Sequence, residues 1–421
     1  TQGVNTFTFT HTDASSNLLF RASGGHYTID NVSVRLAEPN GTITDNTASW
    51  DITPTQLYTY RGPLIEEART NELKSSGDLL NAAYWVQAGG TGAYTTAPDG
   101  TNTALLFTED TTTGVHSAAV SAHRPDSTTW TSEAVSCRVL KSGTRRYVVL
   151  YGGSGVAVVS ATLDTTTGLI TEAVGNSTAT FTSASVSDMG DYWVLSVVGH
   201  YSSNQFVSYV RGSLTATGNG AGMPSYTGDG STIGLWGFQL EKNVLASSSY
   251  IPTTTAAVTR NADQLQYDTA NWYADGKAGT MQVDADLVYT PDGTNATLAM
   301  LHNNSWTNRI TLYRASSNLL YSYVDVNSDF VSLGNESLVK GESARFILGV
   351  KDYDYAFKSS GGTIGSNTTI AAVGGISELT VGGVHTGSQK ANGCVLNIIY
   401  YQKRLANSVI EANSAREYSN D

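Results

Sequence analysis

Ile233-Gly-Leu-Trp-Gly-Phe-Gln-Leu-Glu241 is the stretch that decides the fold, because its apolar residues are spaced as in a half-buried strand. Its form, Ile-x-x-Val/Trp-x-Val/Phe-x-Leu, also closes residues 27–36. An earlier strand pattern precedes each copy, at residues 206–214 and 17–22. This weak internal repeat predicts two copies of one jelly-roll-like module.

The composition favours strands throughout the chain. Charged residues make up only 14% of the 421 positions, whereas glycine occurs 42 times and tyrosine 23 times. β-Branched and aromatic residues suit pleated, half-buried surfaces, and Gly, Asn, Asp and Ser supply turns. We therefore predict an all-β protein of tandem jelly-roll or β-sandwich modules with one short C-terminal helix.

Turn-forming sequences and changes in residue composition divide the chain into four parts. Residues 1–37 read as the closing strands of a partial jelly-roll, whose three strands cannot close a core alone. Residues 38–63 read as a linker, 64–263 as a complete jelly-roll, and 274–421 as a second sandwich. The pattern Ser408-Val-Ile-Glu411 is a capping box, which predicts a helix over residues 408–417.

Charge and cysteine content exclude several classes of protein. The formal net charge is −12, which argues against nucleic acid or an anionic membrane as partner. No run of about 18 apolar residues occurs, so we expect no membrane insertion. Cys137 and Cys394 are the only cysteines, and we expect both to be reduced core residues.

Two phrases carry a resemblance to a known class of module. Leu64-Ile-Glu-Glu-Ala-Arg-Thr-Asn71 with Asn81-Ala-Ala-Tyr-Trp85 resembles the opening of a module common in tailed-bacteriophage structural proteins. The strand 233–241, with Ser249-Tyr-Ile-Pro-Thr253 and Ala257-Val-Thr-Arg-Asn-Ala-Asp263, resembles the close of that module. The resemblance implies a jelly-roll similar to carbohydrate-binding modules.

The C-terminal module resembles the laminin-G/concanavalin-like sandwiches that often follow in such proteins. The matching pieces are Asn308-Arg-Ile-Thr-Leu-Tyr313 and Tyr400-Tyr-Gln-Lys-Arg-Leu405. No aspartate cluster has the spacing of a legume-lectin metal site, so calcium-dependent sugar binding is not implied. We expect no metal and no cofactor.

No recognisable catalytic apparatus is present, and we expect a protein that is not an enzyme. Glu66 and Glu67 form the one tight carboxylate pair, but adjacent residues of an extended segment point to opposite faces. We instead expect Glu66 or Glu67 to pair with Arg260, or Arg69 with Asp263, where the module's ends meet. His116 and His123 are expected in loops or at the surface.

Aromatic residues are the remaining functional lead, because sugar faces stack on flat rings. Trp85, Trp193 and Trp236 lie in strand patterns and are expected in the core. Other aromatic residues lie near turns or at strand positions that alternate with the apolar ones. We take as candidate glycan contacts Trp130, Tyr226, Trp306, Tyr353 and Tyr355.

The resemblance implies a non-enzymatic virion protein, located on the extracellular particle as a fibre, spike or capsid-decorating appendage. Its expected partners are other virion proteins and host cell-surface polysaccharide. The alternatives are a bacterial extracellular glycan-binding protein and the binding part of a polysaccharide depolymerase. We expect a homo-oligomer, with a trimer favoured. The candidate interface segments are the tyrosine pairs Tyr58/Tyr60, Tyr321/Tyr323 and Tyr353/Tyr355.

Overall fold

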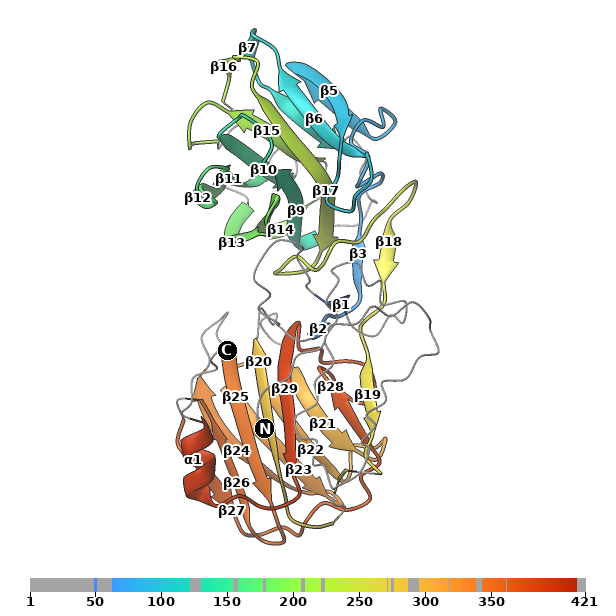
Figure 1. Cartoon of the computed structure of the whole chain (residues 1–421), viewed down its shortest axis with the longest axis vertical. Coiled ribbons are helices and arrows are strands. Elements are labelled where there is room, and N and C mark those ends of the chain that lie inside the picture. The colour runs from blue at the N-terminus through green and yellow to red at the C-terminus, as the bar shows by residue number, and fades with distance from the viewer. Residues whose placement is uncertain are drawn as a thin grey trace, which may run out of the picture. The chain divides into compact units, whose positions relative to one another are not determined.

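A computed structural model shows an almost entirely β-stranded protein (Figure 1). The chain divides into two units, residues 1–44 and 45–421, and the expected partial jelly-roll and most of the expected linker lie outside the described residues. The described residues are 49–50, 63–121, 130–153, 158–176, 179–205, 209–220, 224–270, 272–273, 276–286, 295–317, 319–337, 343–360 and 362–414.

The first sandwich consists of two six-stranded antiparallel sheets. The order in one sheet is β12 (Leu169–Gly175), β11 (Val158–Asp164), β10 (Tyr147–Gly153), β15 (Tyr209–Thr215), β8 (Ser117–Ser121) and β4 (Trp85–Ala88). The order in the other is β13 (Ala179–Asp188), β14 (Tyr192–Gln205), β9 (Trp130–Leu140), β17 (Thr232–Lys242), β6 (Ala104–Glu109) and β5 (Gly90–Thr95).

The core of this sandwich comes from alternate residues of both sheets, such as Leu150 and Val135. The predicted core tryptophans Trp85, Trp193 and Trp236 are all buried, as expected. Trp236 packs in a small separate cluster, because β17 shifts register between Trp236 and Gln239. Gly237 lies at that shift with a φ of 60°, a backbone conformation that glycine adopts without steric cost.

The second sandwich also has two antiparallel sheets. Its seven-stranded sheet runs β1 (Ser49–Trp50), β2 (Pro63–Ile65), β29 (Gly393–Tyr401), β20 (Gly279–Asp286), β25 (Ser343–Val350), β26 (Tyr355–Ser359) and β27 (Gly365–Asn367). Its six-stranded sheet runs β19 (Leu265–Asp268), β28 (Glu378–Val381), β21 (Ala296–His302), β22 (Arg309–Arg314), β23 (Leu319–Val326) and β24 (Asp329–Ser337).

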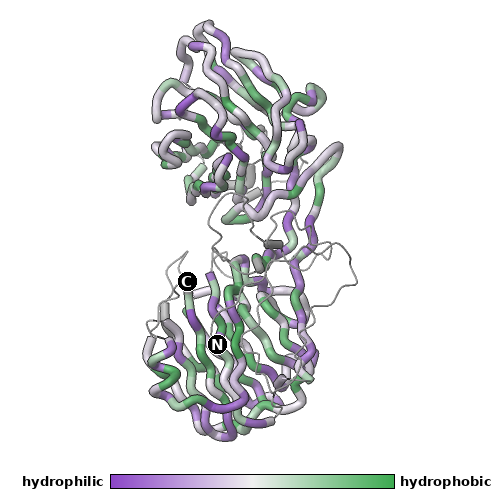
Figure 2. The backbone as a smooth tube through the Cα atoms, in the orientation of Figure 1, coloured by the Kyte–Doolittle hydropathy of each residue, from purple (hydrophilic) through white to green (hydrophobic). Residues whose placement is uncertain are grey.

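Hydrophobic segments run along the strands of each sandwich and are interrupted by hydrophilic stretches (Figure 2). In the second sandwich, Val283 and Phe346 of one sheet share a core with Leu312 and Val324 of the other. Cys137 and Cys394 are both buried and reduced, as expected. The expected all-β class is likewise confirmed in the part of the chain that the structure describes.

The C-terminal helix α1 spans Asn407–Ser414, and Ile410 packs in a small cluster with Ile347, Ala356 and Leu405. The helix was expected to start with Ser408 as its capping residue, but it begins at Asn407. The amide protons of Val409 and Ile410 bond to the carbonyl of Ala406, which places Ser408 within the first turn. No helix among the described residues is long and apolar enough to cross a membrane.

The chain passes between the two sandwiches through neighbouring short strands. β2 pairs with β29, so Leu64 and Ile65 join the second sandwich rather than the first. β3 (Arg69–Asn71) then leads into the first sandwich and pairs with β18 (Val258–Arg260), which leads out of it. Because β19 rejoins the second sandwich, the first sandwich is an insertion into the second.

Candidate ligand-binding face of the second sandwich

The residues expected to pair at the ends of the first module come together as a structural network. Arg260 forms an ion pair with Glu66, and Ser249 donates to the same carboxylate from its amide at 2.8 Å and its hydroxyl at 2.6 Å. The Glu66 amide donates to Asp263 at 2.9 Å, and burial raises the pKa of that carboxyl. Arg69 pairs with Glu67 rather than with Asp263.

One of the five expected glycan contacts faces inward. Tyr355 has no exposed surface and donates its hydroxyl to the carbonyl of Ala371 at 2.5 Å, so its assignment as a glycan contact is wrong. The strand begins at Tyr355, after a turn in which Tyr353 has a φ of 54° and is 59% exposed. Trp130 opens β9, and its side chain lies outside the described residues.

Tyr226 belongs to a closed polar cluster in the first sandwich. Its hydroxyl donates to Glu109, which also pairs with Arg145, and burial raises the pKa of Tyr226 to about 12. The ring of His116 lies 4.6 Å from that of Tyr226. His116 was expected in a loop or at the surface; it lies in the loop between β7 (Thr113–Gly114) and β8, but its side chain is fully buried, with Nδ1 2.7 Å from the carbonyl oxygen of Gly89. His123 lies outside the described residues.

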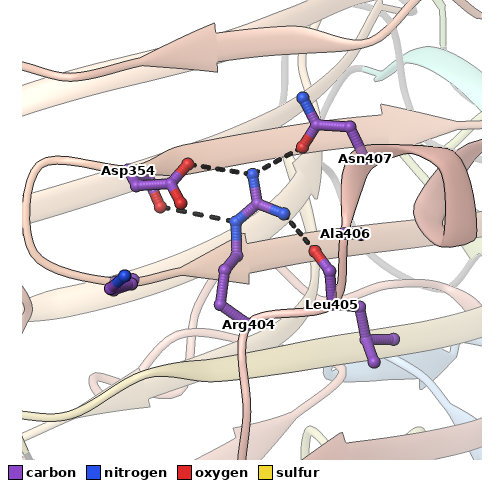
Figure 3. Close-up of a pocket in the computed structure, with 6 residues that line it drawn as sticks. Asp354, Arg404, Leu405, Ala406 and Asn407 are labelled. Carbon is purple, nitrogen blue, oxygen red and sulfur yellow. Dashed lines mark hydrogen bonds and ion pairs between the residues drawn. The ribbon is translucent and has the colours of Figure 1, made fainter.

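In a hollow beside α1, the arginine of the lining is likewise bonded to groups of the protein itself. Arg404 donates to Asp354 at 3.1 Å, to Asn407 at 2.6 Å and to the carbonyl of Leu405 (Figure 3). Lys351 and Ala406 complete the lining. Because Arg404 is satisfied by the chain itself, this hollow serves to fix the start of the helix.

Trp306 is different, because its ring is 43% exposed in the turn between β21 and β22. Asn304 and Asn308 flank it with φ of 62° and 60°, the left-handed conformation that asparagine tolerates better than most residues. The short connection over residues 303–308 thus presents the indole at the end of the sheet. The guanidinium carbon of Arg309 lies 4.5 Å from the centre of the Trp306 ring.

Strand pairing extends this aromatic surface across the sheet. Thr311 of β22 lies opposite Tyr323 of β23, and side chains two positions apart share a face, so Arg309 meets the Tyr323 ring at 4.6 Å. Tyr323 stacks on Phe330 of β24 at 5.3 Å with 16° between the rings, and Phe330 is 64% exposed. We call Trp306, Arg309, Tyr323, Phe330 and His385 the Trp306 face.

His385 reaches the Trp306 face from the loop after β28, with its ring 4.6 Å from that of Trp306. His302 lies behind it at 5.4 Å. Nδ1 of His302 accepts the amide proton of Asn304 at 3.0 Å, so Nε2 carries the proton and donates to Thr380 at 2.8 Å. Burial lowers the pKa of both imidazoles, which are therefore neutral at pH 7.

Several polar atoms around Trp306 lack a partner. Buried atoms without a hydrogen bond in the described structure include Asn303 Oδ1, Arg309 Nε, Thr311 Oγ1 and His385 Nδ1. Buried polar atoms normally find partners, so such a cluster marks a place where water or a ligand supplies them. The Trp306 face combines flat exposed rings with unused donors and acceptors.

Sequence reasoning selected Trp306 but missed its neighbours. β24 was not predicted, because Asp329–Ser337 is interrupted by Gly334 and polar residues, so the exposure of Phe330 was hidden. Tyr323 was assigned to a subunit interface. The alternation of β22 and β23 could have placed Arg309 and Tyr323 on one face, but no local pattern could bring in His385, which lies 79 positions after Trp306.

The sequence matches no protein-family model and no curated protein. Among solved structures, it is similar over 36% of its length to CBM40 of the Ruminococcus gnavus IT-sialidase bound to alpha2,3 sialyllactose, covering 93% of that chain at 14% identity and a TM-score of 0.31. It is similar over 33% of its length to sheep galectin-11, covering 97% of that chain at 11% identity and a TM-score of 0.24. The Limulus polyphemus SAP-like pentraxin matches 33% of the chain, with 71% of its own length covered, 11% identity and a TM-score of 0.26.

Proposed function

We propose that this protein binds glycans without catalysing a reaction on them, and that the Trp306 face is its sugar-binding surface. The observation that carries the proposal is the row of rings from Trp306 through Tyr323 to Phe330, which is partly exposed and bordered by unpartnered polar atoms. Pyranose rings present flat C–H faces to aromatic rings and hydroxyls at their rims. The Trp306 face provides both the aromatic rings and the polar atoms that such a sugar would contact.

We further propose that the chain is an extracellular appendage of a tailed-phage virion, a fibre, spike or capsid decoration, that presents its sandwiches to host-surface polysaccharide. The phrases at residues 64–71 and 257–263 support this proposal by their resemblance to phage structural modules. Copurification with particles would be expected. Secretion of the free protein by a bacterium would favour the bacterial glycan-binding alternative. Loss of polysaccharide viscosity when the protein is linked to a catalytic domain would favour the depolymerase alternative.

The binding proposal is tested by immobilising the protein and measuring its affinity for neutral and acidic polysaccharides. Trp306→Ala should weaken binding about tenfold, which corresponds to a loss of about 1.4 kcal/mol. Tyr94→Ala is the matched control, because Tyr94 is a similarly exposed ring, 49% exposed, in the first sandwich. If wild type binds no polysaccharide, or if both variants lose affinity equally, the Trp306 face is not the binding surface.

A further inference from the structure

We propose that the glycan recognised by the Trp306 face carries carboxylate groups, and that Arg309 binds them. This inference rests on the proposed function and adds the charge of the ligand to it. A neutral glycan would need only the rings and the polar rim. Arg309 supplies a positive charge that forms no ion pair with a described carboxylate of the protein.

Arg309 differs from the other arginines whose contacts the structure describes. Six of these form an ion pair with a carboxylate of the chain, namely Arg69, Arg145, Arg146, Arg260, Arg345 and Arg404. Arg138 instead donates to the carbonyl of Gly237 at 2.9 Å. Arg309 packs against the rings of Trp306 and Tyr323, its buried Nε has no hydrogen bond, and it forms no ion pair with a described residue.

The carboxylate that lies opposite Arg309 in the strand pairing does not form an ion pair with it. Asp325 lies directly opposite it on β23 but is buried and accepts the amide proton of Ser328 at 3.0 Å. The other carboxylate beside this surface, Glu378, accepts from the side-chain amide of Asn304 at 3.1 Å. Both acids of the neighbouring strands are thus held by neutral donors, and the guanidinium fork remains available.

The aromatic contacts also orient the guanidinium. Rings that pack on a guanidinium use its flat face, so its N–H groups point outward in the plane. A carboxylate can approach that edge and accept two parallel hydrogen bonds. A sugar ring lying on the exposed part of Trp306 would then place its acidic substituent at Arg309, 4.5 Å away.

The charged and titratable groups around this site are few. His302 and His385 are neutral at pH 7, and Glu378 and Asp325 are engaged as described. Tyr323 presents its ring to Arg309 and stacks on Phe330. Arg309 is therefore the group on this face whose charge is directed at the ligand, despite the formal net charge of −12 on the whole protein.

The test compares each of three acidic polymers with its own uncharged derivative. Polygalacturonate, alginate and hyaluronan are each measured before and after chemical reduction of their carboxylates to alcohols, by calorimetry at low and at physiological salt. Wild type should bind an acidic form at least about tenfold more tightly than its reduced form, and added salt should narrow the difference. Arg309→Gln should weaken binding of the acidic form far more than binding of the reduced form, and so remove the preference.

Arg309→Lys keeps the charge but loses the planar fork, so we expect intermediate affinity for the acidic form. Thermal unfolding of each variant checks that the sheet is intact. Equal binding of the acidic and reduced forms by wild type, or equal weakening of both by Arg309→Gln, would overturn the role of Arg309 and leave glycan binding standing. Binding of neutral polysaccharides alone would have the same meaning, whereas no binding to any polymer would overturn the proposed function itself.

Discussion

The carboxylate of Glu66 and the guanidinium of Arg260, 194 positions apart in the chain, form an ion pair where the first sandwich is joined to the second. Arg260 also donates to the hydroxyl of Ser249 at 2.7 Å and to the carbonyl of Glu67 at 3.2 Å. The same carboxylate accepts two bonds from Ser249. These contacts tie together the segments that enter and leave the first sandwich.

Glu66→Gln should therefore destabilise the protein, because it leaves the largely buried Arg260 without its counter-charge. We expect a loss of about 2–3 kcal/mol in the free energy of unfolding. The control is Asp188→Asn, which breaks the exposed pair with Lys141 and should cost less than about 1 kcal/mol. Urea denaturation of both variants measures the difference, and equal losses would show that the Glu66 network contributes no more than a surface pair.

Gly168 should resist substitution because of the ring that lies against it. Its φ is 71°, and a Cβ there would come within 2.5 Å of the Trp193 indole, which is held by a 3.0 Å hydrogen bond to the carbonyl of Thr165. Gly168→Ala should cost about 1 kcal/mol for the left-handed backbone and about 1–3 kcal/mol more for overpacking.

The control for this substitution is Gly230→Ala, at a φ of 79° with open space around the added carbon. It carries the backbone cost alone, so we expect about 1 kcal/mol. Thermal or urea unfolding gives both values. If the two variants are equally stable, the contact with Trp193 does not constrain the turn.

The pH dependence of stability should report the buried imidazoles. The pKa of His302 is lowered in the folded state, mainly by burial, so the unfolded chain binds a proton more strongly. Stability is therefore complete above the unfolded pKa of about 6.5 and decreases as the pH falls below it. His302→Gln should flatten the difference in unfolding free energy between pH 7 and pH 5, and an unchanged slope would contradict this assignment.

Cys137 should be inert in the native protein. Burial raises its pKa to about 12, so almost no thiolate is present at neutral pH. Both Cys137 and Cys394 are buried, and we expect neither to react with a thiol reagent until the protein is unfolded. Rapid labelling of one thiol per chain under native conditions would show that one sandwich opens locally.

We expect trimers in sedimentation experiments at micromolar concentration. Of the candidate interface tyrosines, Tyr58 and Tyr60 lie outside the described residues, and Tyr355 is buried in the core, where it cannot reach another subunit. Tyr353 is exposed, while Tyr321 and Tyr323 are half-buried. If the subunits met through Tyr323, polysaccharide binding would compete with assembly, and a monomer at all concentrations would exclude the trimer.

Strand positions could be predicted wherever side chains alternate between a core and a solvent face. Such alternation runs along Arg309–Arg314 and Leu319–Val326, and both segments are strands. Leu169–Gly175 was not predicted, because as an edge strand of its sheet it buries little and its sequence alternates weakly. Edge strands receive hydrogen bonds from one neighbour and can be formed by sequences without a strong pattern.

The site was harder to predict than the fold because it depends on register. Tyr353 and Tyr355 are only two positions apart, but Tyr353 lies in a turn with a φ of 54° and is exposed, whereas Tyr355 begins β26 and is buried. Likewise, the sequence offers Trp306 and His385 as unrelated aromatics. Only the pairing of β21 with β28 brings the segments that carry them together.

Because β3 pairs with β18, the first sandwich is a module whose two ends lie side by side. Arg69 lies opposite Arg260 and Asn71 opposite Val258, so the chain enters and leaves across one rung of an antiparallel ladder, about 5 Å wide. Such a junction can be rejoined by a short turn or can accept another module with adjacent ends. The second sandwich, by contrast, is completed only after the whole insertion has been synthesised, since β2 precedes the insertion and its partner β29 follows it. Exchange of domains at this point would change what the protein presents while the Trp306 face stayed the same.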